Sequence, residues 1–267
     1  MARRKVAQLN ALIAVDKPLG ITSHDVVARV RRAVGERRVG HAGTLDPLAT
    51  GVMVVGIGQA TRLLGMLTLD TKSYVAQIRF GCETVTDDAE GEVSREVPVD
   101  ACLFEESFAR DALARFLGDQ MQTPPAYSAI SVDGVRSYKR VRAGEDVELA
   151  PRPVTVHAAE LYGIAHEDGA PVWTVGFTVS KGTYIRALAR DLGRAVGSAA
   201  HLGALRRTAS GFIGIEHCLA LDGLSVDAAR ASALDPVTAI GVPVFTLDEA
   251  QVSDVLCGKV VAPRGEL

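Results

Sequence analysis

Segments with the apolar pattern of β-strands recur along most of this chain, and no strand–helix–strand unit repeats among them. The expected strands cover residues 11–15, 52–57, 73–81, 153–161, 171–180 and 205–215. The expected helices are fewer and cover residues 22–34, 59–67, 105–118 and 183–196. Repeated crossover helices are typical of parallel α/β sheets, whereas separate strand and helix runs are typical of α+β proteins. We therefore expect an α+β fold with a mixed or antiparallel central sheet and flanking helices.

Two of these segments carry the clearest local signals. Thr22 and Asp25 have the spacing of a capping box, which predicts a helix that begins there and ends near Val34. Alternation in the segment 73–81 predicts a strand with one apolar face. The residues expected on that face are Tyr74, Ala76, Ile78 and Phe80.

The composition is that of an ordinary globular protein, because 48% apolar and 23% charged residues in a chain of 267 predict a sizeable core. No apolar run approaches the length of a membrane span, and Ala11–Val15 is too short for a secretory signal. We therefore expect a cytoplasmic protein. The cysteines show no C-x-x-C spacing, which disfavours a zinc site or a disulfide framework and suits a reducing compartment. They are Cys82, Cys102, Cys218 and Cys257.

The charges are unevenly distributed, although the net charge is only −3. Residues 1–40 carry nine Lys and Arg against three Asp and Glu, and residues 181–210 carry six against one. Residues 82–111 carry two against ten, and we expect the acidic part, 83–100, to form a hairpin or loop excursion. This segregation predicts a basic face that could contact phosphate and a separate acidic face.

Residues 122–151 differ from the rest in texture, with three prolines and two glycines. Basic residues alternate there with Tyr127 and Tyr138, and we interpret the segment as an inserted arm. These basic residues are Arg136, Lys139, Arg140 and Arg142. From about residue 241 the composition turns acidic, and a new unit begins at Phe245.

The stretch Gly40–Gly51, G-H-A-G-T-L-D-P-L-A-T-G, stands directly before the apolar run 52–57. Its glycines give the backbone freedom, while Pro47 pushes Asp46 toward an extended conformation. The pattern presents one carboxylate on a shaped loop, where catalytic groups are often found. An Asp-Pro pair also opens many ordinary turns, so the spacing alone leaves both interpretations open.

This stretch resembles the catalytic motif of the TruB family of pseudouridine synthases, which modify uridine 55 in the T arm of tRNA. Further stretches resemble the same family in the same order, so the resemblance spans about residues 11–213. They are Asp16–Ser23 (D-K-P-L-G-I-T-S), Lys72–Tyr74 (K-S-Y), Gln122–Ala129 (Q-T-P-P-A-Y-S-A) and Lys181–Arg186 (K-G-T-Y-I-R). The resemblance implies the pseudouridine synthase fold, with a catalytic domain over residues 1–240. A truncated or vestigial C-terminal RNA-binding domain would then begin at 241–267.

Pseudouridine formation is an isomerisation, since the base leaves C1′ of the ribose, turns, and rejoins through carbon. It needs no cofactor, and the sequence holds no P-loop, dinucleotide motif or metal-ligand cluster. It does need a carboxylate that acts as nucleophile or base, and Asp46 is the candidate. Attack on the base, attack on the sugar and removal of a ribose proton all remain open. The resemblance implies that Arg186 pairs with Asp46, and Tyr74 offers a flat face on which the flipped uracil can stack.

The resemblance also implies a set of substrate-binding residues. His41 is expected to enter the RNA and fill the space that the flipped base leaves. Leu205 aligns with a leucine that lines the family's pocket, although packing in the core explains it nearly as well. Tyr184 is expected to support the pocket. The remaining candidates are Lys17 in the Asp16–Ser23 motif, Arg206 and Arg207 as phosphate contacts, and Arg136, Lys139, Arg140 and Arg142 as a clamp on the T arm.

Two alternatives remain beside this interpretation. One is a catalytically silent module that binds or folds RNA, which the joint presence of Asp46, Tyr74 and Arg186 argues against. The other is a guide-RNA-dependent pseudouridine synthase, which the intact insert at 122–151 disfavours. We expect a monomer that acts on the tRNA T arm, with no membrane and no obligate protein partner.

Overall fold

The computed structural model describes residues 9–67, 71–132 and 134–262. The strands of the central sheet are β1 (Ala11–Lys17), β2 (Val39–Ala42), β3 (Ala49–Ile57), β4 (Lys72–Phe80), β7 (Gly118–Gln122), β10 (Arg152–Glu167), β11 (Ala170–Val179), β12 (Ala200–Ser210), β13 (Ile213–Gly214) and β14 (Cys218–Ala220). Two further pairs form small hairpins, β5 (Cys82–Thr84) with β6 (Val93–Glu96), and β8 (Ser131–Val132) with β9 (Val135–Arg136).

The α-helices are α1 (Ser23–Val34), α2 (Leu64–Leu67), α3 (Glu106–Ala114), α4 (Ser137–Arg142), α5 (Ile185–Ala195), α6 (Val226–Ala231), α7 (Pro236–Ile240) and α8 (Glu249–Leu256). Three 3-10 turns join them, η1 (Gly58–Leu63), η2 (Ala101–Phe104) and η3 (Ile215–His217).

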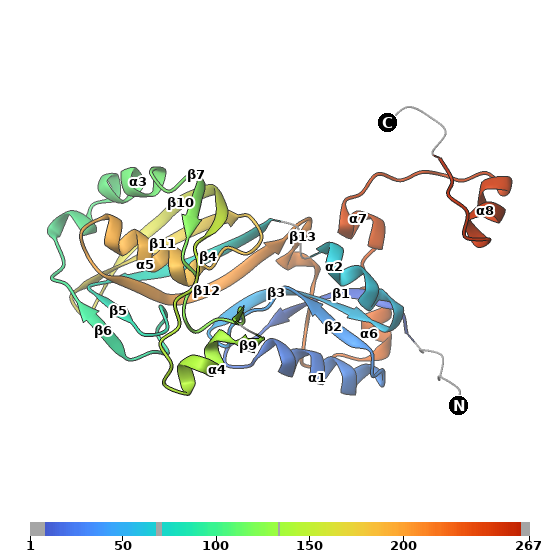
Figure 1. Ribbon diagram of the computed structural model, residues 1–267, viewed down its shortest axis with the longest axis horizontal. Coiled ribbons are helices and arrows are strands. Elements are labelled where there is room, and N and C mark those ends of the chain that lie inside the picture. Colours follow the sequence, from blue (N-terminus) through green and yellow to red (C-terminus); the bar gives the residue numbers. More distant parts are fainter. Residues whose placement is uncertain (1–8, 68–70, 133, 263–267) are drawn as a thin grey trace.

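The central sheet is mixed and runs across the whole body of the molecule (Figure 1). Its strands follow in the order β14-β1-β3-β12-β4-β11-β10-β7, with β2 beside β3 and β13 beside β12. The pairs β1–β14 and β3–β12 are parallel, and the other pairs are antiparallel. The predicted α+β fold with a mixed central sheet is therefore confirmed.

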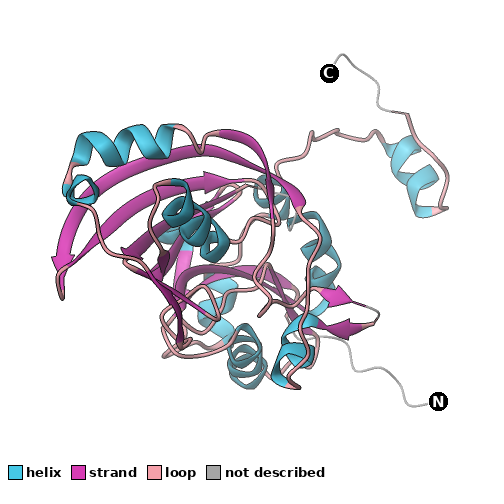
Figure 2. Cartoon of the chain, turned by 60° about the vertical axis from the view of Figure 1, so that its left-hand side comes forward, coloured by secondary structure: helices cyan, strands magenta, loops and turns pink. Residues whose placement is uncertain are grey.

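The helices that cover the sheet each bury an apolar stripe against it. The main core contains residues of α1, α3 and α5 together with residues of β1, β3, β4 and β11. A smaller core on the other face of β1 and β3 holds Leu67 of α2 and Ala239 of α7. Figure 2 shows the helices on both sides of the curved sheet.

Several local predictions are confirmed. The Thr22–Asp25 capping box is present, because Asp25 N–H donates to Thr22 Oγ1 at 3.1 Å and Thr22 N–H donates to Asp25 Oδ2 at 2.9 Å. The strand β4 buries the expected alternate face, and its other residues are half-buried or exposed apart from Lys72. The acidic segment does contain a hairpin, the one formed by β5 and β6.

Other predicted boundaries are wrong. The segment 59–67 is mostly the 3-10 turn η1, where Thr61 Oγ1 donates to Gly58 O at 2.8 Å and competes with regular helix bonds. The strand expected at 205–215 begins earlier, at Ala200, because small residues at its start hide the alternation. The helix expected to reach residue 118 ends at Ala114, and the chain then enters β7.

The C-terminal segment stands apart from the body in both views (Figures 1 and 2). Helix α7 ends at a left-handed Gly241, and a stretch without helix or strand then leads to α8. A domain boundary near residue 241 remains a prediction. The final residues of that unit, 263–267, lie outside the described residues, as do residues 1–8 with their Arg3, Arg4 and Lys5. Within the described residues, no helix has the length and apolar character needed to cross a membrane.

The two halves of the sheet join where β3 runs parallel to β12. This place directly follows the Asp46 loop, the segment that connects β2 to β3. In this pairing Gly51 faces Arg207, and Leu205 faces Ala49. Gly51 has a φ of +102°, and a Cβ placed on it would lie 2.1 Å from Arg207 O. No other residue type fits this position, so the junction fixes the end of the loop.

Replacing Gly51 by alanine should therefore destabilise the fold, because the new methyl group collides with backbone in a strained conformation. We expect the free energy of unfolding to fall on the order of 3 kcal/mol in urea denaturation. Gly163→Ala, in the bulged part of β10, is a matched control because open space surrounds that position. Equal stability of the Gly51→Ala and Gly163→Ala proteins would contradict this account of the junction.

Candidate active site

The Asp46 loop is held by the segment that joins β1 to α1, the Asp16–Ser23 motif of the sequence. Ser23 Oγ donates to Leu45 O and accepts from Leu45 N–H, both at 2.9 Å. Gly20 N–H donates to Pro47 O at 2.9 Å. Bonds to both neighbours of Asp46 fix its backbone, while its side chain stays 41% exposed.

Lys17 is fully buried and lies beneath the same loop. Its ammonium donates to Pro18 O at 3.1 Å, to Pro47 O at 3.3 Å and to Ala49 O. Burial lowers the pKa of Lys17 to about 8, and the negative charge of Asp46 partly opposes this shift. We expected Lys17 to bind the substrate, but its burial makes it a residue that positions the loop.

Arg186 lies at the start of α5 and meets three separate segments of the chain. Its Nε lies 2.9 Å from Asp46 Oδ2, so the structure brings the expected ion pair together. Its Nη1 donates to Thr86 O at 2.8 Å, and its Nη2 donates to Tyr127 O at 3.0 Å. Because the Arg186 side chain is only 6% exposed and bonded at both ends of its fork, the guanidinium has a fixed orientation.

Asp88 is a second acidic neighbour of Arg186 that sequence reasoning missed. Its Oδ2 lies 3.6 Å from Arg186 Nε, and its side chain is 5% exposed. Its Oδ1 accepts from Thr86 Oγ1 at 2.6 Å and from Glu90 N–H at 3.1 Å. Asp88 stands in the turn that joins β5 to β6, within the acidic segment.

The expected separation of acidic and basic faces is wrong for this part of the molecule. Acidic side chains of the β5–β6 hairpin and its turn are buried against arginines of α5. The pairs are Glu83 with Arg194 at 2.6 Å, Asp87 with Arg190 at 2.8 Å and Asp88 with Arg186 at 3.6 Å. A signal was present in the sequence, because arginines four residues apart lie on one helix face.

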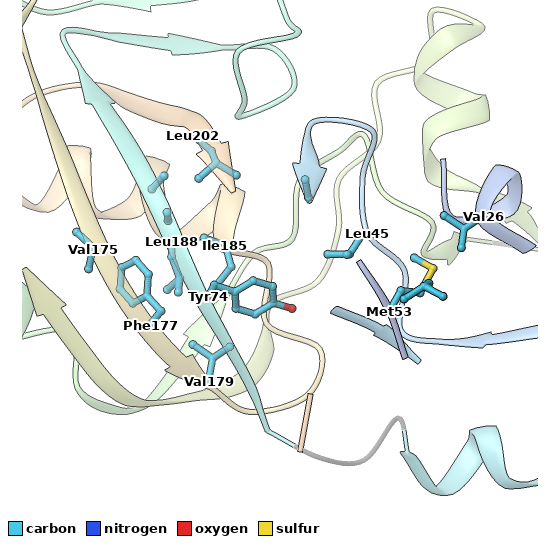
Figure 3. Close-up of a cluster of buried hydrophobic side chains, with 14 of the residues drawn as sticks. Val26, Leu45, Met53, Tyr74, Val175, Phe177, Val179, Ile185, Leu188 and Leu202 are labelled. Atoms are coloured by element: carbon cyan, nitrogen blue, oxygen red, sulfur yellow. The ribbon is translucent and has the colours of Figure 1, made fainter. Parts of the chain in front are cut away.

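Aromatic and apolar candidates lie on the strands and helix beside the loop. Tyr74 on β4 is buried, and its hydroxyl points toward the side where Leu45 lies (Figure 3). Leu205 on β12 is half-buried and packs on the main core. Tyr184 precedes α5, and burial raises the pKa of its phenol. The Gln122 side chain bonds both the N–H and the C=O of Tyr184, at 2.9 and 3.1 Å.

His41 lies on β2 at the entrance to the loop, where it pairs with Val55 of β3. It is half-buried, and its ring lies edge-on to the ring of His24, with centroids 6.1 Å apart. Burial lowers the pKa of His41, and the neighbouring His24 and Arg207 lower it further, while a hydrogen bond with the Gly43 backbone opposes the shift. The site therefore favours the neutral form of the imidazole.

Two arginines expected to contact phosphate are engaged inside the protein. Arg207 is 1% exposed, and it donates to Val52 O at 2.6 Å and to Gly43 O at 3.2 Å. It thus bonds the chain on both sides of the Asp46 loop, and its burial removes it from the set of phosphate contacts. Arg206 is half-exposed but pairs with Asp16 at 2.7 Å.

The cations of the insert differ in their freedom. Three of them are exposed, Arg136, Lys139 and Arg142. Lys139 and Arg142 are three residues apart and lie on the same face of α4. Arg140 is half-buried and pairs with Glu145 at 2.6 Å, so it is less available to RNA. Arg142 lies over the Tyr138 ring, 5.8 Å from its centroid.

Comparison with known proteins assigns the chain to a family. Residues 31–185 match the model of the TruB family pseudouridylate synthase (N terminal domain). The chain is 49% identical over 256 residues to tRNA pseudouridine synthase B of Mycobacteroides abscessus, and the match covers 95% of this chain and 85% of that protein. It is 47% identical over 262 residues to tRNA pseudouridine synthase B of Nocardia farcinica, with 98% and 85% covered.

Solved structures with the same fold come from box H/ACA complexes. The archaeal box H/ACA sRNP Nop10–Cbf5 complex has a chain that is 27% identical, with a TM-score of 0.61. The match covers 88% of this chain and 62% of that one, so this chain spans less than two thirds of the solved protein. Fold and site together define a pseudouridine synthase. The chain belongs to the TruB family.

The low pKa of Lys17 predicts a pH dependence of stability. Its pKa of about 8 in the folded protein lies below the value of 10.5 for the free side chain. Between these values the unfolded chain binds the proton more tightly, so the contribution of Lys17 to stability grows as the pH rises. The difference in unfolding free energy between wild type and Lys17→Met should therefore increase from pH 8 to pH 10. A difference that is constant or shrinks over this range would contradict the assignment.

Proposed function

We propose that this protein converts uridine 55 in the T loop of tRNA to pseudouridine, without a cofactor and without a guide RNA. The observation that carries the proposal is the ion pair of Asp46 and Arg186, formed where the family-like motifs of the sequence meet. The names of the similar proteins from Mycobacteroides abscessus and Nocardia farcinica support tRNA as the substrate. The intact insert supports action on tRNA without a guide.

The two members of the pair have different access to a ligand. Arg186 is closed off by protein, whereas the Asp46 carboxylate remains partly open. The Arg186 guanidinium can therefore orient the Asp46 carboxylate from the protein interior, while the exposed side of the carboxylate faces a nucleotide. Asp46 is then the nucleophile or base of the isomerisation. The glycosidic bond from C1′ to nitrogen breaks, a bond from C1′ to carbon forms, and the displaced proton moves to the freed nitrogen.

A uridine inside a folded T loop must leave its stack before Asp46 can reach it. Tyr74 lies on the strand beside the loop, and we assign it the face against which the flipped uracil stacks. Leu205 and Tyr184 complete the walls of this pocket. We assign His41 to the space that the base leaves, where the neutral form favoured by burial can stack or accept a hydrogen bond.

The RNA surface that we propose consists of exposed cations that have no carboxylate partner within the described residues. They are Arg136, Lys139 and Arg142 of the insert, with Arg32, Arg37 and Arg38 at the end of α1 and the turn that follows it. Phosphate contacts of this kind need a local positive surface rather than a positive net charge. We propose a cytoplasmic monomer that binds the T arm through this surface.

The function is tested by incubating the purified protein with an unmodified tRNA transcript and mapping pseudouridine at each nucleotide. Wild type should place it at position 55. Asp46→Asn should lose at least about 10³-fold in rate while its Kd for tRNA stays the same, since the amide keeps the shape but not the charge. The control is Asp168→Asn, an exposed carboxylate at the β10–β11 turn. Turnover by Asp46→Asn within tenfold of wild type would remove Asp46 from the mechanism.

The arm predicts a salt dependence that can be measured apart from catalysis. Replacing Arg136, Lys139 and Arg142 together by glutamine should reduce the slope of log K against log salt by up to about three. The rate at saturating tRNA should not change, because these side chains hold phosphates rather than the base. Arg115→Gln, at the exposed residue that directly follows α3, is the control for a lost surface charge. An unchanged slope in the triple variant would place the arm away from the RNA.

A further inference from the structure

Arg190 repeats the arrangement of Arg186 one helical turn further along α5. Its Nη1 donates to Asp87 Oδ2 at 2.8 Å, and its Nη2 donates to Thr123 O at 2.8 Å. Arg186 in the same way bonds Thr86 O of the hairpin turn and Tyr127 O of the insert. Each arginine therefore joins the same two loops to α5.

The two arginines together hold both ends of a short loop. The bonded carbonyls belong to Thr123 and Tyr127, the first and last residues of the loop that leads from β7 into the insert. Arg190 is 9% exposed, and Asp87 is 8% exposed. An ion pair this buried excludes water, so its geometry is held more firmly than that of a surface pair.

Asp87 also has an unusual backbone. Its φ is +60°, in the left-handed region that residues with a side chain seldom occupy. Its N–H donates to Thr84 O at 3.1 Å, and its C=O accepts from Leu202 N–H of β12 at 3.1 Å. Strained residues of this kind persist where the surroundings fix them, and they gather near active sites.

The turn at Asp87 places both of its neighbours on Arg186. Thr86 O accepts from Nη1, and the Asp88 carboxylate lies near Nε. Asp87 itself points to the next arginine, so the Arg190–Asp87 bond, together with the backbone bonds to Leu202, holds the turn against α5. A shift of this turn would move two of the groups that orient Arg186.

We propose that Asp87 and Arg190 are a positioning pair for the reaction, which hold the hairpin turn and the Thr123–Tyr127 loop in the arrangement that aligns Arg186 with Asp46. Neither side chain is required to touch the RNA. The inference rests on the proposed isomerase function for its kinetic effect, but its structural part can be measured without substrate.

The pair should respond to acid. Burial raises the pKa of Asp87 to about 6, and the charge of Arg190 opposes that rise most strongly. The other charged groups that face Asp87 are Arg186, Arg194 and Asp191, all on α5. As the pH falls through about 6, Asp87 gains a proton, the ion pair loses its charge, and the rate should fall with it.

The test uses Asp87→Asn and Arg190→Gln, because asparagine tolerates the left-handed conformation and neither change creates a large cavity. Single-turnover rates at saturating tRNA should fall about 10- to 100-fold, since a small misplacement near the chemistry has effects of this size. The Kd for tRNA should stay within threefold. Arg190→Lys should recover part of the rate, and the acid limb near pH 6 should be absent in Asp87→Asn.

The chain offers a matched control one turn further along the helix. Arg194 pairs with Glu83 of the same hairpin at 2.6 Å but bonds no residue of the insert among the described contacts. Arg194→Gln therefore removes an ion pair between the same elements, although a more exposed one, and should leave the single-turnover rate unchanged. It separates positioning from a general loss of stability.

Hydrogen–deuterium exchange supplies the readout that needs no substrate. Amide exchange should increase in Arg190→Gln within residues 84–90 and at Thr123, Ala126 and Tyr127, the residues of the segment 123–127 that carry an N–H. It should stay unchanged at these three residues in Arg194→Gln. If wild type made no pseudouridine on tRNA, the proposed function would be wrong, while the exchange result would still judge the pair. Unchanged exchange at 123–127, a rate loss no larger than that of Arg194→Gln, or an effect on Kd alone would each overturn the inference.

Discussion

A buried guanidinium is the group on which the site depends. Arg186 is almost closed to solvent, so its charge must be balanced by groups within the protein. Two carbonyls, Thr86 O and Tyr127 O, occupy the fork, and Nε is left to face Asp46 and Asp88. These acceptors come from three segments far apart in the sequence. The cost of an unpaired buried charge makes their meeting at α5 a condition of the folded state.

The carboxylate side of this pair depends on two other buried cations. Arg207 bonds the chain at Gly43 and Val52, on the two sides of Asp46, and Lys17 bonds the carbonyls of Pro47 in the loop and of Ala49 at the start of β3. The strand β12 carries Arg207 and joins the two halves of the sheet at the same place. The sheet therefore restrains the loop that presents Asp46.

The charged residues of this protein include both buried ion pairs and exposed cations without a carboxylate partner among the described residues. The arginines of α5 form ion pairs with acidic residues of the β5–β6 hairpin and its turn, and each pair has little net charge. The exposed cations of the insert and of the region around Arg37 have no such partners among the described residues. A chain with a net charge of −3 can therefore still present a basic surface to phosphate.

The sequence by itself determined the local features and the identity of the central pair. Alternation located β4, the Thr22–Asp25 spacing located the start of α1, and motifs located Asp46 and Arg186, because each signal lies within a short stretch. Only the tertiary structure decided which charges face one another. Lys17 and Arg207 look like surface cations in sequence, and Asp87 and Asp88 look like solvated acids. Their burial follows from contacts between strands, loops and a helix that are 30 to 155 residues apart, and a local pattern does not say which residues meet.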